Sequence, residues 1–296
     1  MYKTLIVSAL ILVFGAAVFS QTPKSLPDLK PDEIIARHLA SIGSPEAISA
    51  VKSRVFVGQA RLTSRIGYIG QLTGQAQFAS AGNNLLLAAI FNSNEYPYEK
   101  AAFNGKDVSV GRPNGNLTPF GDFLKANKGI IREGLFGGVL STAWPLLSKE
   151  GKLKFTSAGI AEIGGRSFYK LKVTGGSLGG TKVVMFFDGE NFRHAATEYT
   201  QTISVGISKG NKPAPESDDF GTNTGTAMAN TKETYMTFTE RFSNYAKSGD
   251  TVIPLTYVID YTYQDKNGVT TTLNLDVRFK DVYLNQDLGA DVFNVS

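Results

Sequence analysis

A regular alternation of apolar and polar residues near the C-terminal end constrains the fold most strongly. Two runs carry it, one at Leu255, Tyr257, Ile259, Tyr261 and Tyr263 and the other at Leu273, Leu275, Val277 and Phe279. Successive side chains of a strand point to opposite faces, so each run predicts a strand with one apolar and one polar face. Asn267-Gly268 between them is a strong hairpin signal. The chain therefore predicts an antiparallel sheet whose apolar face must be covered.

The composition agrees with a large β protein. The chain has 296 residues, with 31 glycines, 12 tyrosines, 19 phenylalanines and only 19% charged residues, which favours a turn-rich sheet over helices. Residues 209–231 are rich in Gly, Pro, Ser, Asn, Asp and Thr, and the strand pattern resumes at Glu233. We therefore predict a single domain over residues 30–296, with a mobile loop at 209–231.

The first residues have the layout of an export signal. Lys3 is the only charge in residues 1–20, an apolar stretch follows, and Val18-Phe19-Ser20 suits a cleavage site before Gln21. We predict a signal peptide at 1–20, a flexible segment at 21–29 and an exported, periplasmic or cell-envelope protein without a membrane span in the mature chain. An uncleaved N-terminal anchor is the alternative.

Two features of composition exclude several functions. The chain has no cysteine, which excludes disulfides, thiol catalysis, cysteine metal sites and a lipid-bearing cysteine. The formal net charge is +4, and no dense Lys/Arg cluster is present, so we predict no nucleic acid partner.

Two helical regions interrupt the strand pattern. Pro31, Asp32 and Glu33 suit the start of a helix that ends at Gly43, and a short helix follows Pro45. Residues 118–149, called the lid below, combine apolar residues at mixed helical spacing with interruptions at Gly129, Gly134, Gly137 and Gly138, and predict two short helices or a helix and an irregular arm. Strands are expected at about 54–62, 68–79, 84–91, 98–103, 107–111, 153–157, 167–174, 182–187 and 192–205.

No catalytic or cofactor site is predicted. Ser208 lies in a Gly-x-Ser-x-Gly pattern, but the prolines that follow cannot begin the helix that a hydrolase nucleophile needs. His38 fits a hydrogen-bonded core position, and the residues before His194 fit a hairpin turn better than a metal site. The chain also lacks a phosphate-binding glycine motif. We therefore expect no enzyme, no cofactor and no metal.

The aromatic and aliphatic residues of the lid and of the alternating strands are the remaining signal. Glycines beside aromatic residues favour a cover that can shift. The predicted ligand-binding residues of an apolar trough and its lid are Leu135, Phe136, Leu140, Trp144, Phe238, Tyr257, Ile259, Tyr261, Leu275 and Val277.

Four short segments resemble the bacterial outer-membrane lipoprotein-sorting proteins with the LolA/LolB-like fold. They are residues 32–43 with 50–53, residues 132–138 with 144–146, residues 187–194, and the tail from Glu240 to Val295. The resemblance implies a mainly β fold with a strongly curved antiparallel sheet, an unclosed half-barrel covered by an N-terminal helix and a helical lid. It also implies a ligand such as a lipid or the acyl chain of a lipoprotein.

Two functions follow. The first is a periplasmic carrier that holds a lipid or lipoprotein acyl chain in the apolar trough. The second is a cell-envelope interaction or sensor module. In it the same fold of this chain binds a protein partner, through the loop 209–231. The sequence leaves open whether the trough is empty or filled by the protein's own helices.

Overall fold

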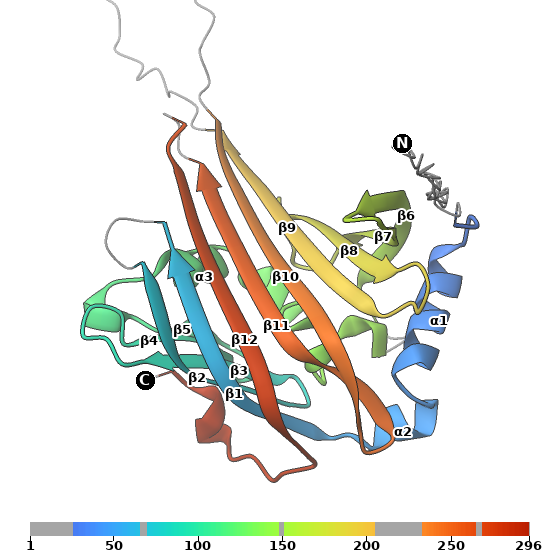
Figure 1. The fold of residues 1–296 in the computed structure, drawn as a ribbon, viewed down its shortest axis with the longest axis horizontal. Coiled ribbons are helices and arrows are strands. Elements are labelled where there is room, and N and C mark those ends of the chain that lie inside the picture. Colours follow the sequence, from blue (N-terminus) through green and yellow to red (C-terminus); the bar gives the residue numbers. More distant parts are fainter. Residues whose placement is uncertain (1–25, 66–69, 148–150, 205–232, 265–267, 296) are drawn as a thin grey trace, which may run out of the picture.

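A single antiparallel sheet of twelve strands organises the chain (Figure 1). A computed structural model describes residues 26–65, 70–147, 151–204, 233–264 and 268–295. The strands are β1 Ser53–Ser64, β2 Gln71–Ala81, β3 Asn84–Phe91, β4 Tyr98–Phe103, β5 Val108–Val110, β6 Leu153–Ile163, β7 Arg166–Gly175, β8 Lys182–Asp188, β9 His194–Ser204, β10 Glu233–Ser248, β11 Thr251–Gln264 and β12 Thr270–Leu284.

The strand order places the first and last strands together in the middle of the sheet. The order is β5-β4-β3-β2-β1-β12-β11-β10-β9-β8-β7-β6, with Arg54 opposite Leu284 and Leu62 opposite Leu275 in the β1–β12 pair. The two edge strands are therefore β5 and β6, which follow each other in the sequence. Because the sheet is not closed, the chain between these edges has to cross the open side of the half-barrel.

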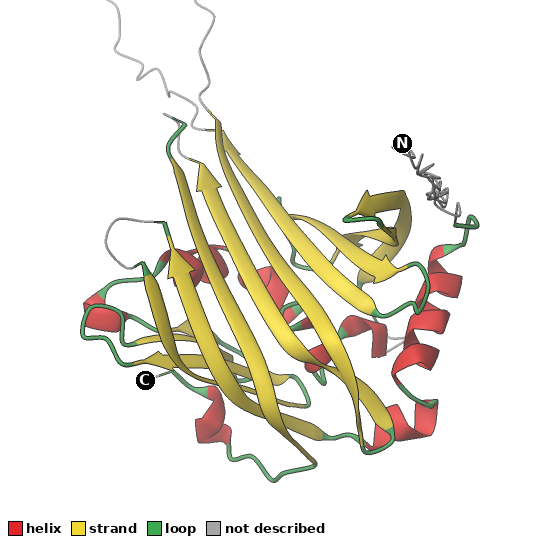
Figure 2. Cartoon of the chain, viewed as in Figure 1, coloured by secondary structure: helices red, strands yellow, loops and turns green. Residues whose placement is uncertain are grey.

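The lid is this crossing segment. It contains α3 Pro119–Ala126 and α4 Lys128–Arg132, followed by the 3-10 turns η2 Gly138–Leu140 and η3 Pro145–Leu147; η1 Pro113–Gly115 precedes it. Thr118 is the N-cap of α3, because its Oγ1 accepts a hydrogen bond from the Gly121 N–H at 2.8 Å. Figure 2 shows these helical segments behind the long strands of the sheet.

The N-terminal helices cover another part of the same face. In α1 Pro31–Ile42, the Glu33 carboxylate accepts from the Lys30 N–H at 2.9 Å, and Ile34, His38 and Ile42 are buried. The helix α2 Pro45–Ala50 starts with Ser44 as its cap. Gly43 bridges to Thr251 at the turn between β10 and β11, which fixes both helices at one end of the sheet (Figure 1).

Most of the core lies between the concave face of the sheet, the lid and α1. A second, small cluster lies on the outer face, where Phe293 of η4 Ala290–Phe293 packs against Val55, Ala79, Leu86 and other residues of β1–β4. The C-terminal segment thus covers one end of the outer face. Among the described residues, no helix combines the length and apolar character that crossing a membrane requires.

The fold class predicted from the sequence is confirmed: a mainly β chain with a curved, unclosed antiparallel sheet, covered by an N-terminal helix and a helical lid. The lid forms two short helices, which is one of the two alternatives predicted for it. Strand β6 continues to Ile163 instead of ending at Ser157, because Gly159 at φ +82° lies where the β6–β7 register shifts. The signal peptide at 1–20, most of the segment 21–29, the loop 209–231 and Asn267 lie outside the described residues.

Gly58 is a point where the sheet bends. The β1–β12 register shifts between Val57 and Gly58, which marks a β-bulge. The backbones approach so closely there that a Cβ on Gly58 would overlap with the carbonyl oxygen of Arg278. Glycine is therefore required at this position for the curvature of the sheet.

We expect Gly58→Ala to lower the free energy of unfolding by about 1–3 kcal/mol, because backbone atoms must move to admit the methyl group. Urea unfolding followed by circular dichroism measures the change. Gly180→Ala is the matched control, since no atom lies within 4 Å of a Cβ there. Its effect should stay within about 0.5 kcal/mol, and equal effects of both variants would contradict the proposed role of Gly58.

Candidate functional site

The ten residues predicted to line the trough and its lid lie in one buried cluster. Tyr261 is 4% exposed, Trp144 is 1% exposed and the other eight are 0% exposed. Leu135, Phe136, Leu140 and Trp144 come from the lid, and the remaining six come from β10, β11 and β12. The structure therefore brings all ten together and shows the lid packed into the concave face.

Phe238 of β10 is the centre of the contact between lid and sheet. The ring of Phe123 stacks on it with 4.8 Å between centroids, and the rings of Phe120 and Phe136 lie 5.5 and 6.1 Å away. Offset or tilted aromatic pairs at such distances add to the free energy of burial. Three phenylalanines of the lid thus surround one phenylalanine of the sheet, at the place where the sequence predicts the trough.

A buried carboxylate, Glu240, lies on the same face. Its Oε1 accepts from the Gly137 N–H of the lid at 2.7 Å and from the Tyr257 hydroxyl, and its Oε2 accepts from the Tyr199 hydroxyl at 2.7 Å. Glu240 is 0% exposed, and burial raises its pKa to about 7. A carboxylate in an apolar core costs stability unless it is fully hydrogen-bonded. Here its partners come from two neighbouring strands and the lid.

The sequence analysis did not select Glu240, although a signal is present. Phe238, Glu240 and Phe242 occupy alternate positions of β10 and so share its inward face. The register places Glu240 between Thr197 of β9 and Ile259 of β11. A single charged residue within an inward aromatic pattern is the available signal, and the predicted residues include Phe238 but neither Glu240 nor Phe242.

Side-chain contacts hold the lid on the sheet. Besides Glu240, the Arg54 Nη1 donates to the Val139 carbonyl at 2.6 Å, and the Ser80 Oγ lies 2.7 Å from the Thr142 Oγ1 and 3.4 Å from the Ser141 Oγ. Within the described ranges, no backbone–backbone hydrogen bond joins the lid to a strand of the sheet. Opening of the lid would therefore break none of the hydrogen bonds between the strands.

The glycines of the lid also have a packing role. Gly137 and Gly138 have φ angles of +79° and +45°, which favour glycine, and a Cβ on either would clash with a ring of the sheet. The obstructing rings are Phe78 for Gly137, and His194 and Phe242 for Gly138. The sequence analysis interpreted these glycines as signs of movement, and the structure shows that they also allow the lid to lie close to the sheet.

Both histidines lie buried around Trp144. The ring centroids of His38 and His194 are 5.0 and 4.8 Å from that of Trp144. The His38 Nδ1–H donates to the Phe192 carbonyl at 2.9 Å, and burial lowers the pKa of His38 to about 4. Burial also lowers the pKa of His194. His38 is thus a hydrogen-bonded core residue, as the sequence indicates. No group of three potential metal ligands occurs in the part of the chain that the structure describes.

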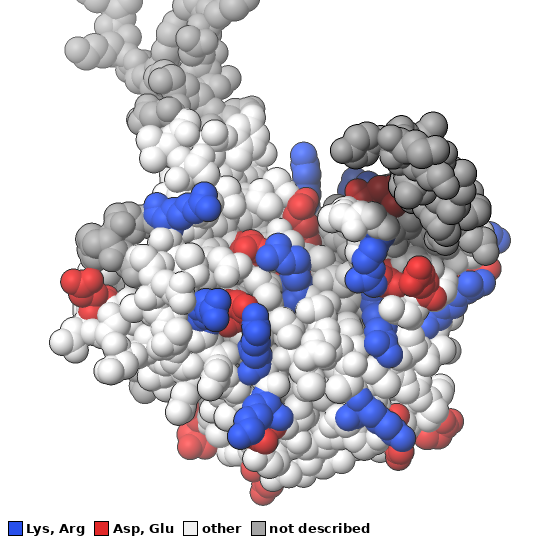
Figure 3. All heavy atoms as spheres, viewed as in Figure 1, with Lys and Arg blue, Asp and Glu red and all other residues white. Residues whose placement is uncertain are grey.

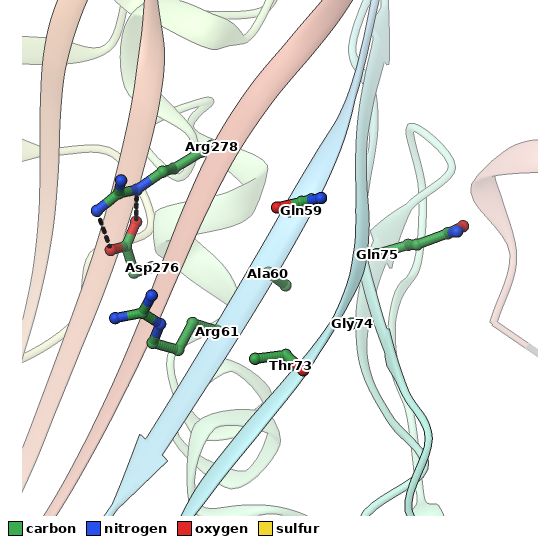
Figure 4. Close-up of a pocket in the computed structure, with 8 residues that line it drawn as sticks. All are labelled: Gln59, Ala60, Arg61, Thr73, Gly74, Gln75, Asp276 and Arg278. Atoms are coloured by element: carbon green, nitrogen blue, oxygen red, sulfur yellow. Dashed lines mark hydrogen bonds and ion pairs between the residues drawn. The ribbon is translucent and has the colours of Figure 1, made fainter.

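A hollow of about 540 Å³ on the outer face has a different character (Figure 4). Gln59, Arg61, Gln75 and Arg278 line it, and Arg278 is paired with Asp276. Basic and acidic side chains are interspersed over this face (Figure 3). This hollow is polar and separated from the trough by the sheet, so it does not extend the apolar site.

The burial of Glu240 makes stability depend on pH. In the folded state the carboxyl keeps its proton up to a pKa of about 7, whereas the unfolded chain releases it near 4.5. The folded state binds more protons between these values, so the stability that the raised pKa contributes is full below pH 4.5 and is lost as pH rises to 7. The shift corresponds to about 3 kcal/mol at most.

We expect Glu240→Gln to remove this loss, because the amide cannot ionise. The free energy of unfolding of the variant minus that of the unmodified chain should be larger at pH 8 than at pH 4. Urea unfolding of both proteins at both pH values measures this difference. At pH 4 the glutamate is protonated in both states, so that measurement isolates the cost of the amide itself. Parallel pH profiles for the two proteins would show that Glu240 does not titrate as described.

The comparisons with known proteins give structural neighbours only. No family model and no curated protein sequence matches the chain. A LolA superfamily protein from Nitrosomonas europaea is 14% identical, with a TM-score of 0.44, over 90% of this chain and 99% of that one. A putative outer membrane lipoprotein-sorting protein domain from Vibrio parahaemolyticus is also 14% identical, with a TM-score of 0.42, over 88% and 95%.

A third neighbour is a complex of Pseudomonas aeruginosa MucA and MucB, at 9% identity and a TM-score of 0.21, over 86% of this chain and 100% of that one. Two of these solved structures are described as a LolA superfamily protein and a putative lipoprotein-sorting protein domain. Each TM-score is below 0.5, so the neighbours assign no ligand and no partner. The function proposed below rests on the geometry of the chain itself.

Proposed function

We propose that this protein is an exported binding protein that carries a lipid or lipoprotein acyl chain between the concave face of its sheet and the lid. One observation carries the proposal: the lid covers a mainly apolar face and, among the described residues, no backbone–backbone hydrogen bond joins it to a strand, so opening of the lid would leave the ladder of strands intact. An apolar face with a detachable apolar cover is what a reversible carrier of hydrophobic ligands requires.

A ligand has to replace the lid in the trough. Phe120, Phe123 and Phe136 fill the space over Phe238, so an acyl chain enters only when these rings withdraw. Burial of each CH₂ group contributes about 0.8 kcal/mol, and a long chain gains on the order of 10 kcal/mol before ordering costs. Burial of each of the three rings contributes about 1.5–3 kcal/mol, so the gain is of the same order as the loss of their contacts.

The carrier needs no catalytic group, which fits the residues at the site. Glu240 on the concave face makes its hydrogen bonds to Tyr199, Tyr257 and Gly137 within the protein, and the buried Trp144 Nε1 is without a hydrogen-bond partner. We infer a binding protein and not an enzyme. Export and the signal peptide at 1–20 remain part of this proposal.

The alternative, a cell-envelope module that binds a protein partner, stays a prediction. Its proposed docking segment is the loop 209–231, which lies outside the described residues. The described residues favour the carrier, because they show an apolar face and its cover.

A disulfide between the lid and the sheet tests the carrier directly. We expect Ser80→Cys with Ser141→Cys to form the single disulfide of a chain that has no other cysteine. The two hydroxyl oxygens lie 3.4 Å apart, which brings two sulfurs within reach of a bond of about 2.05 Å. Oxidation should abolish binding of a fluorescent long-chain fatty acid in the trough, and reduction should restore it.

The single variants Ser80→Cys and Ser141→Cys are the matched controls, and neither should respond to oxidant. Tyr261→Trp places a fluorescent reporter beside Phe123 of the lid, since the ring centroids of Tyr261 and Phe123 are 5.9 Å apart. Quenching of the fluorescence of this tryptophan identifies binding in the trough. Unchanged quenching after oxidation of the double variant would contradict a lid that has to open.

A further inference from the structure

A groove of about 660 Å³ lies outside the trough, between the N-terminal helices and the end of the lid. Its walls are mainly apolar and come from α1, α2, the start of β1 and η3; they include Ala36, Leu39, Ile48, Val51, Leu146 and Leu147. The volume is in the range of small-molecule sites. The groove is open while the lid is closed, so it does not depend on movement of the lid.

One buried cation lines this apolar groove. Arg54 is only 3% exposed, and its Nη1 donates to the Val139 carbonyl, but its Nε has no hydrogen-bond partner. None of the ion pairs formed by the described residues includes Arg54. Burial also lowers the pKa of Arg54 to about 10. A buried guanidinium without an anionic partner is costly, and an anion in the groove would compensate for it.

The other charges of the groove agree with an anionic occupant. Lys52 is the second ionisable residue of the lining, and no aspartate or glutamate belongs to it. Lys52 is exposed, and its Nζ donates to the Ser49 carbonyl at 2.7 Å, which keeps the ammonium beside the groove. The lining therefore combines an apolar surface with two cations, one buried and one at the solvent boundary.

We propose that the groove binds an unbranched alkyl chain with one terminal carboxylate, the carboxylate pairing with the guanidinium of Arg54 while the chain lies along α1, α2 and η3. The guanidinium offers its N–H groups in a planar fork that matches a carboxylate, and Nη1 can keep its bond to Val139. The site is distinct from the trough, because its lining contains none of the ten predicted trough residues, and the lid contributes only Thr142, Leu146 and Leu147 to it. It would therefore exist even if the trough bound nothing.

Dodecanoate and dodecan-1-ol, which share chain length and differ in charge, test the proposal by isothermal titration calorimetry. The unmodified protein should bind dodecanoate at least tenfold more tightly than the alcohol. Arg54→Met should reduce dodecanoate binding to the level of the alcohol, and Arg54→Lys should keep part of the preference. Equal affinities in the unmodified protein, or a preference that survives in Arg54→Met, would overturn the proposal.

A second pair of variants keeps the test valid if loss of the Val139 contact unfolds Arg54→Met. Ala36→Phe fills the groove from an exposed position of α1, and Ala50→Phe places the same ring on α2 outside the lining. Dodecanoate binding should fall at least tenfold in the first and persist in the second. Equal binding by both would exclude the groove.

The locked variant with cysteines at positions 80 and 141 separates the two sites. Neither position lines the groove, so the oxidised protein should keep its preference for dodecanoate while it loses binding in the trough. Loss of the preference on oxidation would place the carboxylate in the trough and overturn the groove site. If the preference for dodecanoate is retained and the protein shows no binding in the trough, oxidised or reduced, the groove site is supported and the carrier function is contradicted.

Discussion

The pairing of β1 with β12 is the constraint on which the rest of the structure depends. It joins the first and last strands in the middle of the sheet and leaves β5 and β6, which are consecutive in the chain, at opposite edges. The connection between them must then cross the open side of the half-barrel. A crossing segment over an apolar face has to be apolar itself, which explains why residues 118–149 are unlike a surface loop. The lid is a consequence of the topology.

The same topology accounts for the polar groups buried under the lid. Since a segment without strand structure cannot join the ladder, its backbone groups need partners from side chains of the sheet. Glu240 provides one for the Gly137 N–H, Ser80 for the Thr142 N–H, and Arg54 for the Val139 carbonyl. Each of these residues is buried where an apolar residue would otherwise be expected. They give the closed lid a defined position, whereas packing of rings alone would leave its register loosely fixed.

The sequence predicted what depends on local pattern. The alternation at Leu255–Tyr263 gave β11 its inward face, and the start of α1 followed from Pro31 and Glu33. The predicted strand 153–157 is shorter than β6, because Gly159 interrupts the alternation. In the structure the strand continues through a bulge at this position. The partner of β1 could not be predicted, because Arg54 and Leu284 are 230 positions apart and nothing local selects their register. The ten residues predicted for the trough were selected by their apolar character, so the polar Glu240 and Arg54 were not among them.

Arg54 connects the two proposed sites. Its Nη1 donates to the η2 turn of the lid, its Nε is buried without a hydrogen-bond partner, and the residue belongs to the lining of the groove. An anion beside the guanidinium would reduce the cost of keeping it buried, and the buried position is the one from which Nη1 reaches Val139. Groove occupancy and lid closure therefore favour each other through one side chain. Under the proposed function, the closed, filled core would be the resting state of the carrier, and an amphipathic anion in the groove would stabilise that state without entering the trough.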